Sequence, residues 1–180
     1  LGSGNELMLE QILSDLQSIK LDDRKIVIRP PKETGIGKMM GRMIREFAAN
    51  NPGRFIICPL QDMADFASAL VHCDMMISNH PGSLMLAASE KKPAVHVTRK
   101  GRSRIRTWNQ IDIEAGSGAL VSAVQKALSK SFTDELGLMI SPYEQTHVAR
   151  KIKERICTFD SAQIKAKSFY LAGEPGFGGE

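Results

Sequence analysis

The stretch Asp74-Met-Met-Ile-Ser-Asn-His-Pro-Gly-Ser83, followed by Leu84-Met-Leu-Ala-Ala88, decides the fold. Residues 74–78 are predicted to form a short buried strand, because apolar residues there are bounded by polar turn formers. Pro81 and Gly82 then indicate a tight turn, and the apolar residues after it indicate a helix over about 81–91. The stretch therefore predicts one strand–turn–helix step of an α/β protein.

The same alternation of short apolar strands and helical stripes extends in both directions along the chain. Strands are predicted at 25–29, 54–58, 93–98 and 110–113, and helices at about 6–20, 40–47, 63–70, 120–128 and 143–158. Strands of about five residues alternating with longer helices are typical of βαβ units. The predicted fold class is α/β, a Rossmann-like parallel sheet with helices on both faces. We expect one domain over 1–159 and a flexible tail over 160–180.

The glycine-containing segment before the second helix does not fit a phosphate-binding P-loop. Gly35 and Gly37 are predicted to keep this segment a loop. Lys32 stands where a P-loop needs glycine, and Met39 stands where it needs the serine or threonine that holds magnesium. The segment is therefore interpreted as a flexible connection.

Composition places the chain among ordinary globular domains and excludes several other classes. The 180 residues are 42% hydrophobic and 24% charged, with a net charge of +4, and no apolar run reaches the length of a membrane helix. Three scattered cysteines favour free thiols in a reducing, cytoplasmic setting. No metal-ligand spacing is present, so no cofactor is predicted. The small positive charge suits a phosphorylated ligand without requiring nucleic acid.

The turn after the strand at 74–78 is the first candidate site. Parallel sheets bind ligands beyond the carboxyl ends of their strands. A helix beginning at this turn would present free backbone N–H groups and a partial positive charge, which suit phosphate. Asn79, His80 and Ser83 add side-chain donors. The alternative is an ordinary turn in which the polar side chains only cap the helix.

A basic segment, Arg99-Lys-Gly-Arg-Ser-Arg-Ile-Arg106, is the second candidate site and directly follows the strand at 93–98. It carries five basic residues within eight positions. We expect it to lie near the 78–83 turn, so that both contact one anion. A solvated charged loop is the alternative. Nucleic-acid binding is disfavoured, because only Trp108 would supply an aromatic platform nearby.

The remaining polar residues do not predict a catalytic centre. His96 lies within a predicted strand, where a structural role is favoured, and His72 lies at a helix end. Neither a Ser/His/Asp arrangement nor a pair of positioned carboxylates can be identified from the sequence. No catalytic residue is therefore assigned.

The order of several segments resembles the carboxyl-terminal half of the UDP-N-acetylglucosamine 2-epimerase family, and its hydrolysing branch most closely. The resemblance rests on Cys73-Asp-Met-Met-Ile-Ser-Asn79, Ala87-Ala-Ser-Glu-Lys-Lys-Pro93, Lys100-Gly-Arg102 and Ser141-Pro-Tyr143. It implies one half of a GT-B fold, which binds a sugar nucleotide between two Rossmann-like domains. The implied role is in amino-sugar synthesis of the sialic-acid type.

The resemblance also implies roles for individual residues. Asn79, His80, Gly82 and Ser83 would hold the diphosphate of a UDP-sugar, most simply UDP-N-acetylglucosamine. Arg99 and Arg102 would lie near that diphosphate, and Leu60 in the 59–61 loop would line the uracil pocket. The catalytic carboxylates of the family lie mainly in the amino-terminal half. That half is missing here, as is the opening strand of this domain, so this chain alone is expected to be inactive. Whether it forms a homo-oligomer is left open.

Two departures from the family pattern keep other functions open. His80-Pro81-Gly82 replaces consecutive serines, and Leu86 stands where a glutamate would hold the ribose. A different sugar nucleotide, a GT-B glycosyltransferase half, or a non-catalytic domain that has lost its site are the alternatives.

Overall fold

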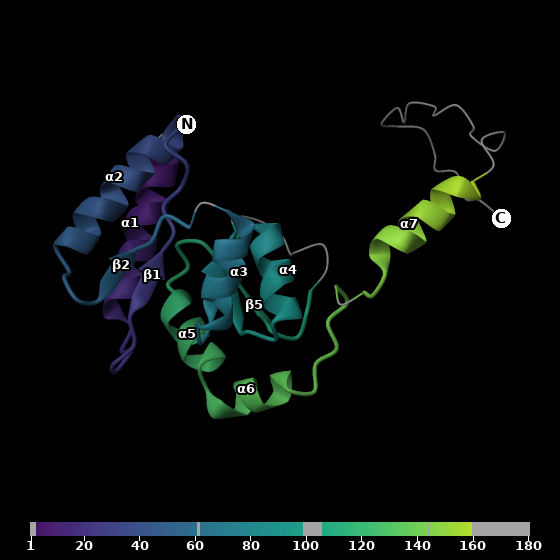
Figure 1. Cartoon of the computed structure of the whole chain (residues 1–180). Coiled ribbons are helices and arrows are strands. Elements are labelled where there is room, and N and C mark those ends of the chain that lie inside the picture. The colour runs from purple at the N-terminus through teal and green to yellow at the C-terminus, as the bar shows by residue number, and fades with distance from the viewer. Residues whose placement is uncertain (1–2, 61, 99–105, 144, 160–180) are drawn as a thin grey trace, which may run out of the picture. The chain divides into compact units, whose positions relative to one another are not determined.

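Parallel strand pairing organises the first of the two compact units into which the chain divides, residues 1–144. The computed structural model describes residues 3–60, 62–98, 106–143 and 145–159. Strand β1 (Ile26–Ile28) pairs with β2 (Phe55–Ile57) in one sheet. Strands β3 (Met76–Ser78), β4 (Ala94–Thr98) and β5 (Gln110–Glu114) form a second sheet in that order (Figure 1).

Helices alternate with the strands from β1 to β4, as the sequence pattern predicts, whereas β5 follows β4 with no helix in the described residues between them. The described helices of the first unit are α1 (Ser3–Ser18), α2 (Ile36–Ala49), α3 (Met63–Val71), α4 (Pro81–Ser89), α5 (Leu120–Ala127) and α6 (Lys130–Leu136). Helix α7 (Val148–Cys157) belongs to the second unit, residues 145–180. No helix in the described ranges combines the length and the apolar character that crossing a membrane requires.

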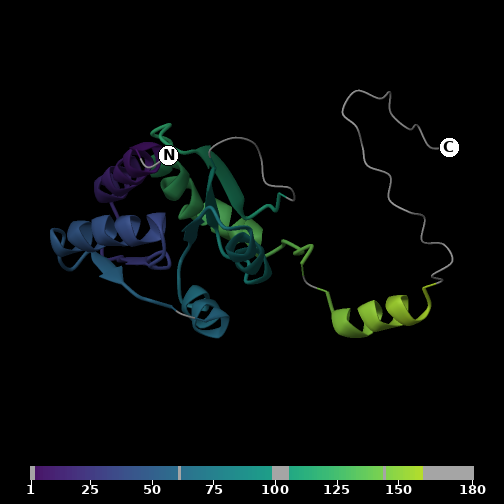
Figure 2. The same ribbon diagram turned by 90° about the horizontal axis from the view of Figure 1, so that it is seen from above.

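Helices cover both faces of the three-stranded sheet. Successive side chains of a strand point to opposite faces, so Met76 and Ala94 share one face while Val95 and Val97 occupy the other. Met76 and Ala94 pack with Leu84 of α4 and with a residue of α3, Leu70. The opposite face packs against α1 and α5. Figure 2 shows this layering from above. The predicted fold class, an α/β domain with parallel strands and Rossmann-like layers, is confirmed.

Helix α1 packs against both sheets. Its residues Leu16 and Ile19, the second just beyond the helix end, belong to the same apolar cluster as Phe55 of β2 and Val95 of β4. Arg54 donates hydrogen bonds to the carbonyls of Leu16, at 3.0 Å, and of Ile19. These carbonyls have no partner within the helix, so the guanidinium stabilises the end of α1 and ties it to β2.

The segment around Gly37 is helical, so the prediction that it remains a loop is wrong. Gly35 precedes the first residue of α2 with φ of +52°, a conformation that glycine adopts easily. A Cβ on Gly37 would lie 2.1 Å from the backbone oxygen of Lys32. The glycine at this position therefore allows the chain to fold back closely at the start of α2.

The structure corrects the prediction near the carboxyl end in two respects, an additional helix and a later start of the last helix. Helix α6 was not predicted, since its seven residues are mostly polar; the Ser129 side chain caps it by accepting a hydrogen bond from the Phe132 N–H at 3.4 Å. The last helix begins at Val148 rather than near residue 143. His147 adopts a left-handed φ of 57°, which a continuing α-helix cannot contain.

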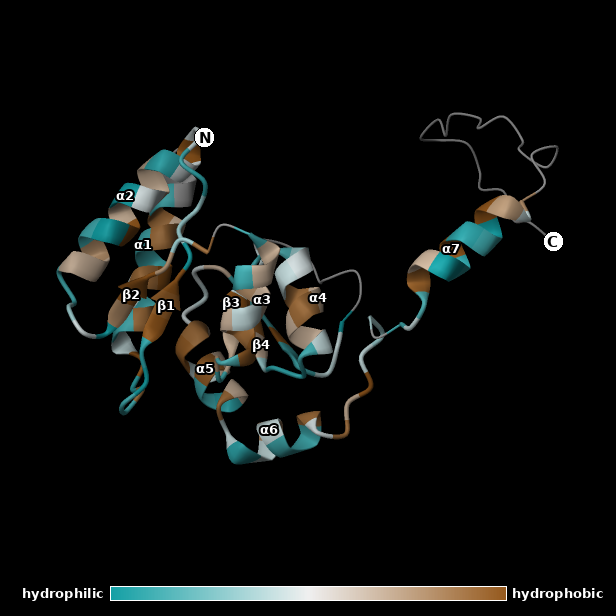
Figure 3. Cartoon of the chain, in the orientation of Figure 1, coloured by the Kyte–Doolittle hydropathy of each residue, from teal (hydrophilic) through white to brown (hydrophobic). Residues whose placement is uncertain are grey.

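Helix α7 carries an apolar stripe of Val148, Ile152 and Ile156, all of which are exposed. Their spacing of four residues places them on one face, and none of the ten residues in α7 is buried. Figure 3 shows hydrophobic and hydrophilic residues side by side along this helix. The predicted tail, 160–180, lies outside the described residues.

Candidate functional site

His80, in the turn between β3 and α4, makes hydrogen bonds to the first residues of the helix. His80 is the residue that caps α4, and its Nδ1 accepts a hydrogen bond from the Ser83 N–H at 3.4 Å. The His80 carbonyl accepts from the N–H groups of Ser83, at 3.1 Å, and of Leu84, at 3.2 Å. Pro81 occupies the first helical position, where a missing N–H costs nothing.

This geometry modifies the expectation of several free N–H groups at the start of the helix. Pro81 has no N–H group, and those of Ser83 and Leu84 are already paired with His80. A Cβ on Gly82 would lie 3.1 Å from Cε1 of the His80 ring, so the ring lies close over the first turn. Asn79 and His80 are exposed, while Ser83 is buried. An anion at this helix end therefore needs the His80 side chain to move or to act as a donor itself.

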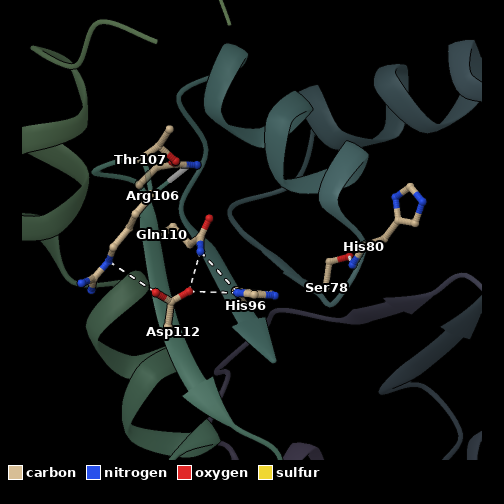
Figure 4. Close-up of polar contacts among 8 residues, drawn as sticks. Ser78, His80, His96, Arg106, Thr107, Gln110 and Asp112 are labelled. Atoms are coloured by element: carbon tan, nitrogen blue, oxygen red, sulfur yellow. Dashed lines mark hydrogen bonds and ion pairs between the residues drawn. The ribbon is translucent and has the colours of Figure 1, made fainter. Parts of the chain in front are cut away.

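A row of polar side chains crosses the second sheet immediately before the turn. Ser78 of β3 is in register with His96 of β4, and His96 is in register with Asp112 of β5. The three residues follow Met76 and Ala94 on the sheet face that α4 covers. Figure 4 shows the His96 ring between Asp112 and Ser78. The row thus connects the candidate turn to the edge strand.

Hydrogen bonds and one ion pair hold the centre of this row. His96 Nδ1 lies 2.9 Å from Asp112 Oδ1, and the two side chains are only 12% and 15% exposed. The Gln110 amide donates to the same Asp112 oxygen and lies 3.3 Å from His96 Nδ1. Arg106 Nε lies 3.4 Å from Asp112 Oδ2 (Figure 4). A carboxylate that contacts Nδ1 fixes the orientation of the ring and leaves Nε2 for another partner.

The sequence reading missed the pairing of His96 with Asp112. His96 was assigned a structural role by itself, and Asp112 was not singled out within the strand predicted at 110–113. The available signal was one polar residue in each of two apolar strands, at positions that parallel pairing brings into register. Recognising this alignment requires knowledge of the strand order, which the local sequence pattern does not contain.

Arg106 is the only residue of the basic segment 99–106 that the structure describes. Arg99 and Arg102 lie outside the described residues. Arg106 is half exposed and is paired with Asp112, so its charge is already partly neutralised. The structure therefore brings the last residue of the basic segment to the polar row, and it leaves the predicted convergence on one anion as a proposal.

Two other residues singled out from the sequence also belong to the first unit. Leu60 follows β2 in the two-stranded sheet and is half-buried; its N–H donates to the Cys58 carbonyl at 2.9 Å. In the described residues no hydrogen bond joins it to the 78–83 turn. Leu86 of α4 packs against the apolar cluster of Leu70, Met76 and Leu84.

An open pocket of about 530 Å³ lies beside β5. It is lined by Arg106, Trp108, Gln110, Asp112, Lys126 and Glu135, among others. Its wall shares Arg106, Gln110 and Asp112 with the hydrogen-bonded network, so the polar row is accessible from the β5 edge.

The strand order and the strand–turn–helix step at β3–α4 define a Rossmann-like α/β class of domain. Comparison with known proteins shows which family the chain belongs to. Residues 3–157 match the family described as UDP-N-acetylglucosamine 2-epimerase, and the chain belongs to that family. It is similar to a Legionella pneumophila protein named UDP-N,N'-diacetylbacillosamine 2-epimerase (hydrolyzing), with 24% identity over 136 residues. The match covers 69% of this chain and 35% of the relative, so the chain spans about a third of that protein's length.

Proposed function

We propose that this chain is the carboxyl-terminal, sugar-nucleotide-binding half of a hydrolysing 2-epimerase, with a GT-B arrangement of two halves. The observation that carries the proposal is the amino end of α4 at the carboxyl edge of a parallel sheet, in a member of the 2-epimerase family. Helix amino ends at such edges are common diphosphate sites. The proposed substrate is a UDP-sugar, with UDP-N-acetylglucosamine as the first to test.

In this proposal the turn binds the diphosphate and the basic segment supplies charge. Asn79, Gly82 and Ser83 position the phosphates at the helix end, and Arg99 and Arg102 contact them as donors. His80 turns away from the Ser83 N–H on binding, or donates to a phosphate oxygen in its protonated form. Leu60 and its neighbours line the base.

The chemistry at the sugar carbon is assigned to a second domain. Epimerisation and hydrolysis at a sugar carbon need positioned acids and bases. Among the described residues near the turn, the largely buried carboxylate is Asp112; its Oδ1 contacts His96 and Gln110, and its Oδ2 forms an ion pair with Arg106 but accepts no hydrogen bond. The role proposed for this half is to bind and orient the nucleotide, while a closing partner half excludes water. A place in sialic-acid-type amino-sugar synthesis is part of the same proposal.

Two observations favour a second candidate, a non-catalytic domain that has lost its site. His80 occupies the helix end with its own side chain, and Leu86 is part of the apolar cluster rather than free to meet a ribose. Such a domain would retain the fold without binding nucleotide.

Calorimetric titration distinguishes the two candidates. The chain is titrated with UDP-N-acetylglucosamine, UDP and uridine, and then with UDP for the variants Arg102→Ala and Lys153→Ala. We expect UDP to bind more tightly than uridine, and Arg102→Ala to weaken UDP while leaving uridine unchanged. Lys153 is an exposed residue of α7 and serves as the charge-matched control. No heat with any of the three ligands, and no shift of the melting temperature, supports the non-catalytic domain instead.

A further inference from the structure

Trp108 is a large exposed side chain in a segment that is otherwise anchored. It is 73% exposed, whereas its neighbours in the chain, Thr107 and Asn109, are 6% and 0% exposed. The Thr107 hydroxyl donates to the Asn109 side-chain oxygen, and the Asn109 amide donates to the Lys92 carbonyl at 2.7 Å. The two buried neighbours hold the backbone of Trp108 in place. The indole is therefore presented to solvent from a fixed position, which reduces the entropy that binding a ligand would cost.

The same tryptophan lines the open pocket of about 530 Å³ beside β5. Small-molecule sites have volumes of about 300–1,000 Å³, so the size of this pocket suits such a ligand. Ile111 of β5 and two residues of α6, Phe132 and Leu136, also line it, and all three are buried or half-buried. The pocket therefore combines room for a small molecule with an apolar side on which a ring can pack.

The charged side chains of the pocket lining have both signs. Arg106 and Lys126 are cationic, and Asp112 and Glu135 are anionic, so their formal charges cancel. Arg106 is paired with Asp112. Within the described residues, the side chains of Lys126 and Glu135 make no hydrogen bond or ion pair, either with each other or with a third group. The lining thus offers one free donor and one free acceptor, which suit a ligand with no net charge better than a simple anion or cation.

Trp108 lies at the opposite edge of the second sheet from the β3–α4 turn. It precedes Gln110, the first residue of β5, whereas the turn follows Ser78, the last residue of β3. Strands β3, β4 and β5 are parallel, so the start of β5 and the end of β3 lie at opposite edges of the sheet. Nucleotide sites of this fold lie at the carboxyl edge. A ligand on Trp108 is therefore distinct from the nucleotide, and its binding does not rest on the proposed function.

We propose that this pocket binds a neutral sugar, with one pyranose ring stacked on Trp108. A pyranose has an apolar face of C–H groups, which packs on an aromatic ring, and a rim of hydroxyl groups that both donate and accept hydrogen bonds. Lys126 donates to the rim and Glu135 accepts from it. A phosphate or an ammonium ion would use the charges alone, and exposed charge pairs contribute little in water. The indole face is what the lining offers beyond charge, and it favours a ring.

Tryptophan fluorescence of the full chain tests the proposal directly, because the sequence contains a single tryptophan and the signal comes from this site alone. The probes are two neutral trisaccharides, cellotriose and triacetylchitotriose. Sorbitol is the control, since it carries the hydroxyl groups without a ring. At least one trisaccharide should shift the emission maximum to shorter wavelength and protect the indole from quenching by acrylamide. Sorbitol should do neither.

Variants measured by saturation-transfer NMR on the sugar signals assign the binding to the indole. Trp108→Ala should weaken the responding trisaccharide at least about 10-fold, and Trp108→Phe, which keeps a ring, less than about 3-fold. Leu138→Ala is the matched control, because Leu138 is also strongly exposed and lies outside the pocket lining, and it should leave binding unchanged. Since these side chains are exposed, none of the variants should unfold the chain.

Several results would overturn the proposal. One is the absence of any fluorescence change with both trisaccharides, and another is an equal response to sorbitol. A stronger response to the zwitterion glycylglycine or to the aromatic base of adenosine would assign the pocket to a different ligand. Equal weakening by Leu138→Ala and Trp108→Ala would show that the indole is not the contact. Emission that is already at short wavelength and protected from acrylamide before sugar is added would show that the indole is covered in solution.

Discussion

His96 Nδ1 and Asp112 Oδ1 lie 2.9 Å apart and join the central strand β4 to the edge strand β5 through a nearly buried pair. Backbone pairing alone would leave these two polar groups on a face that α4 covers. His96 and Gln110 both contact Asp112 Oδ1, whereas the buried Oδ2 accepts no hydrogen bond and has the Arg106 guanidinium 3.4 Å away as its charge partner. The network therefore makes the polar row compatible with the interior of the fold.

Removing the Asp112 carboxylate should destabilise the chain more than removing an exposed one. Asp112→Ala leaves His96 and Gln110 without their acceptor, which should lower the free energy of unfolding by about 1–3 kcal/mol. Asp134→Ala, which removes the exposed pairing with Lys130 on α6, should change it by less than about 0.5 kcal/mol. Urea unfolding of both variants gives the comparison, and equal effects would show that the network is not a stabilising element.

Two glycines of α2 should respond oppositely to alanine. Gly37→Ala places a Cβ 2.1 Å from the Lys32 oxygen and should cost about 1–3 kcal/mol, because backbone must move. Gly41→Ala meets only the flexible Arg45 side chain at 3.4 Å, and the helix gains about 1 kcal/mol of intrinsic preference. Thermal melts of the two variants should therefore shift in opposite directions. A loss of stability in Gly41→Ala equal to that in Gly37→Ala would contradict the close approach.

The cysteines should differ in their reaction with iodoacetamide. Burial raises the pKa of the Cys73 thiol; a smaller opposing effect comes from Lys92, and Asp74 raises the pKa further. A raised pKa lowers the thiolate fraction at neutral pH, and the thiolate is the reacting species. Cys73 should therefore alkylate more slowly than the exposed Cys157, and its rate should rise at a higher pH. Peptide mapping after timed alkylation measures both rates, and a Cys73 that reacts first at pH 7 would contradict this environment.

Leu86→Glu should separate the two candidate functions. If a ribose pocket persists beside α4, the new carboxylate should strengthen UDP binding relative to inorganic pyrophosphate. Because Leu86 contacts the Leu70–Met76–Leu84 cluster, the variant should also lose about 1–3 kcal/mol of stability, whereas Leu86→Met should lose less than about 1.5 kcal/mol. Calorimetry at a temperature where both variants are folded is the measurement. Loss of stability without any gain for UDP would favour the domain that has lost its site.

The alternation of strands and helices could be predicted because each element carries its own periodicity. Four strands lie within the predicted ranges, β5 extends one residue beyond its range to Glu114, and α4 begins at the Pro81-Gly82 turn as expected. Helix α6 escaped prediction, since its polar residues lack an apolar stripe and only the Ser129 cap marks its start. Gly37 was predicted to lie in a loop because glycine is common in loops. In the structure it lies in α2, where the absence of a Cβ permits a close approach to the Lys32 backbone.

The candidate site was predictable where it is local in sequence. The β3–α4 turn comprises six neighbouring residues, and its position at a helix start follows from Pro81. The contacts that involve His96, Asp112 and Arg106 depend on which strands pair and in which register. Register between separate strands is a property of the whole sheet, and a local pattern does not contain it.

The exposed stripe of Val148, Ile152 and Ile156 on α7 affects how this helix melts, which circular dichroism can follow. A ten-residue helix in which no residue is buried has little beyond its own backbone bonding to hold it, and isolated helices of this length are marginal in water. Heating should therefore give a gradual, non-cooperative loss of ellipticity from this segment at low temperature, before the sharp transition of the sheet-containing part. A baseline that slopes below the main melt would be the signature of α7 rather than of a loosened core.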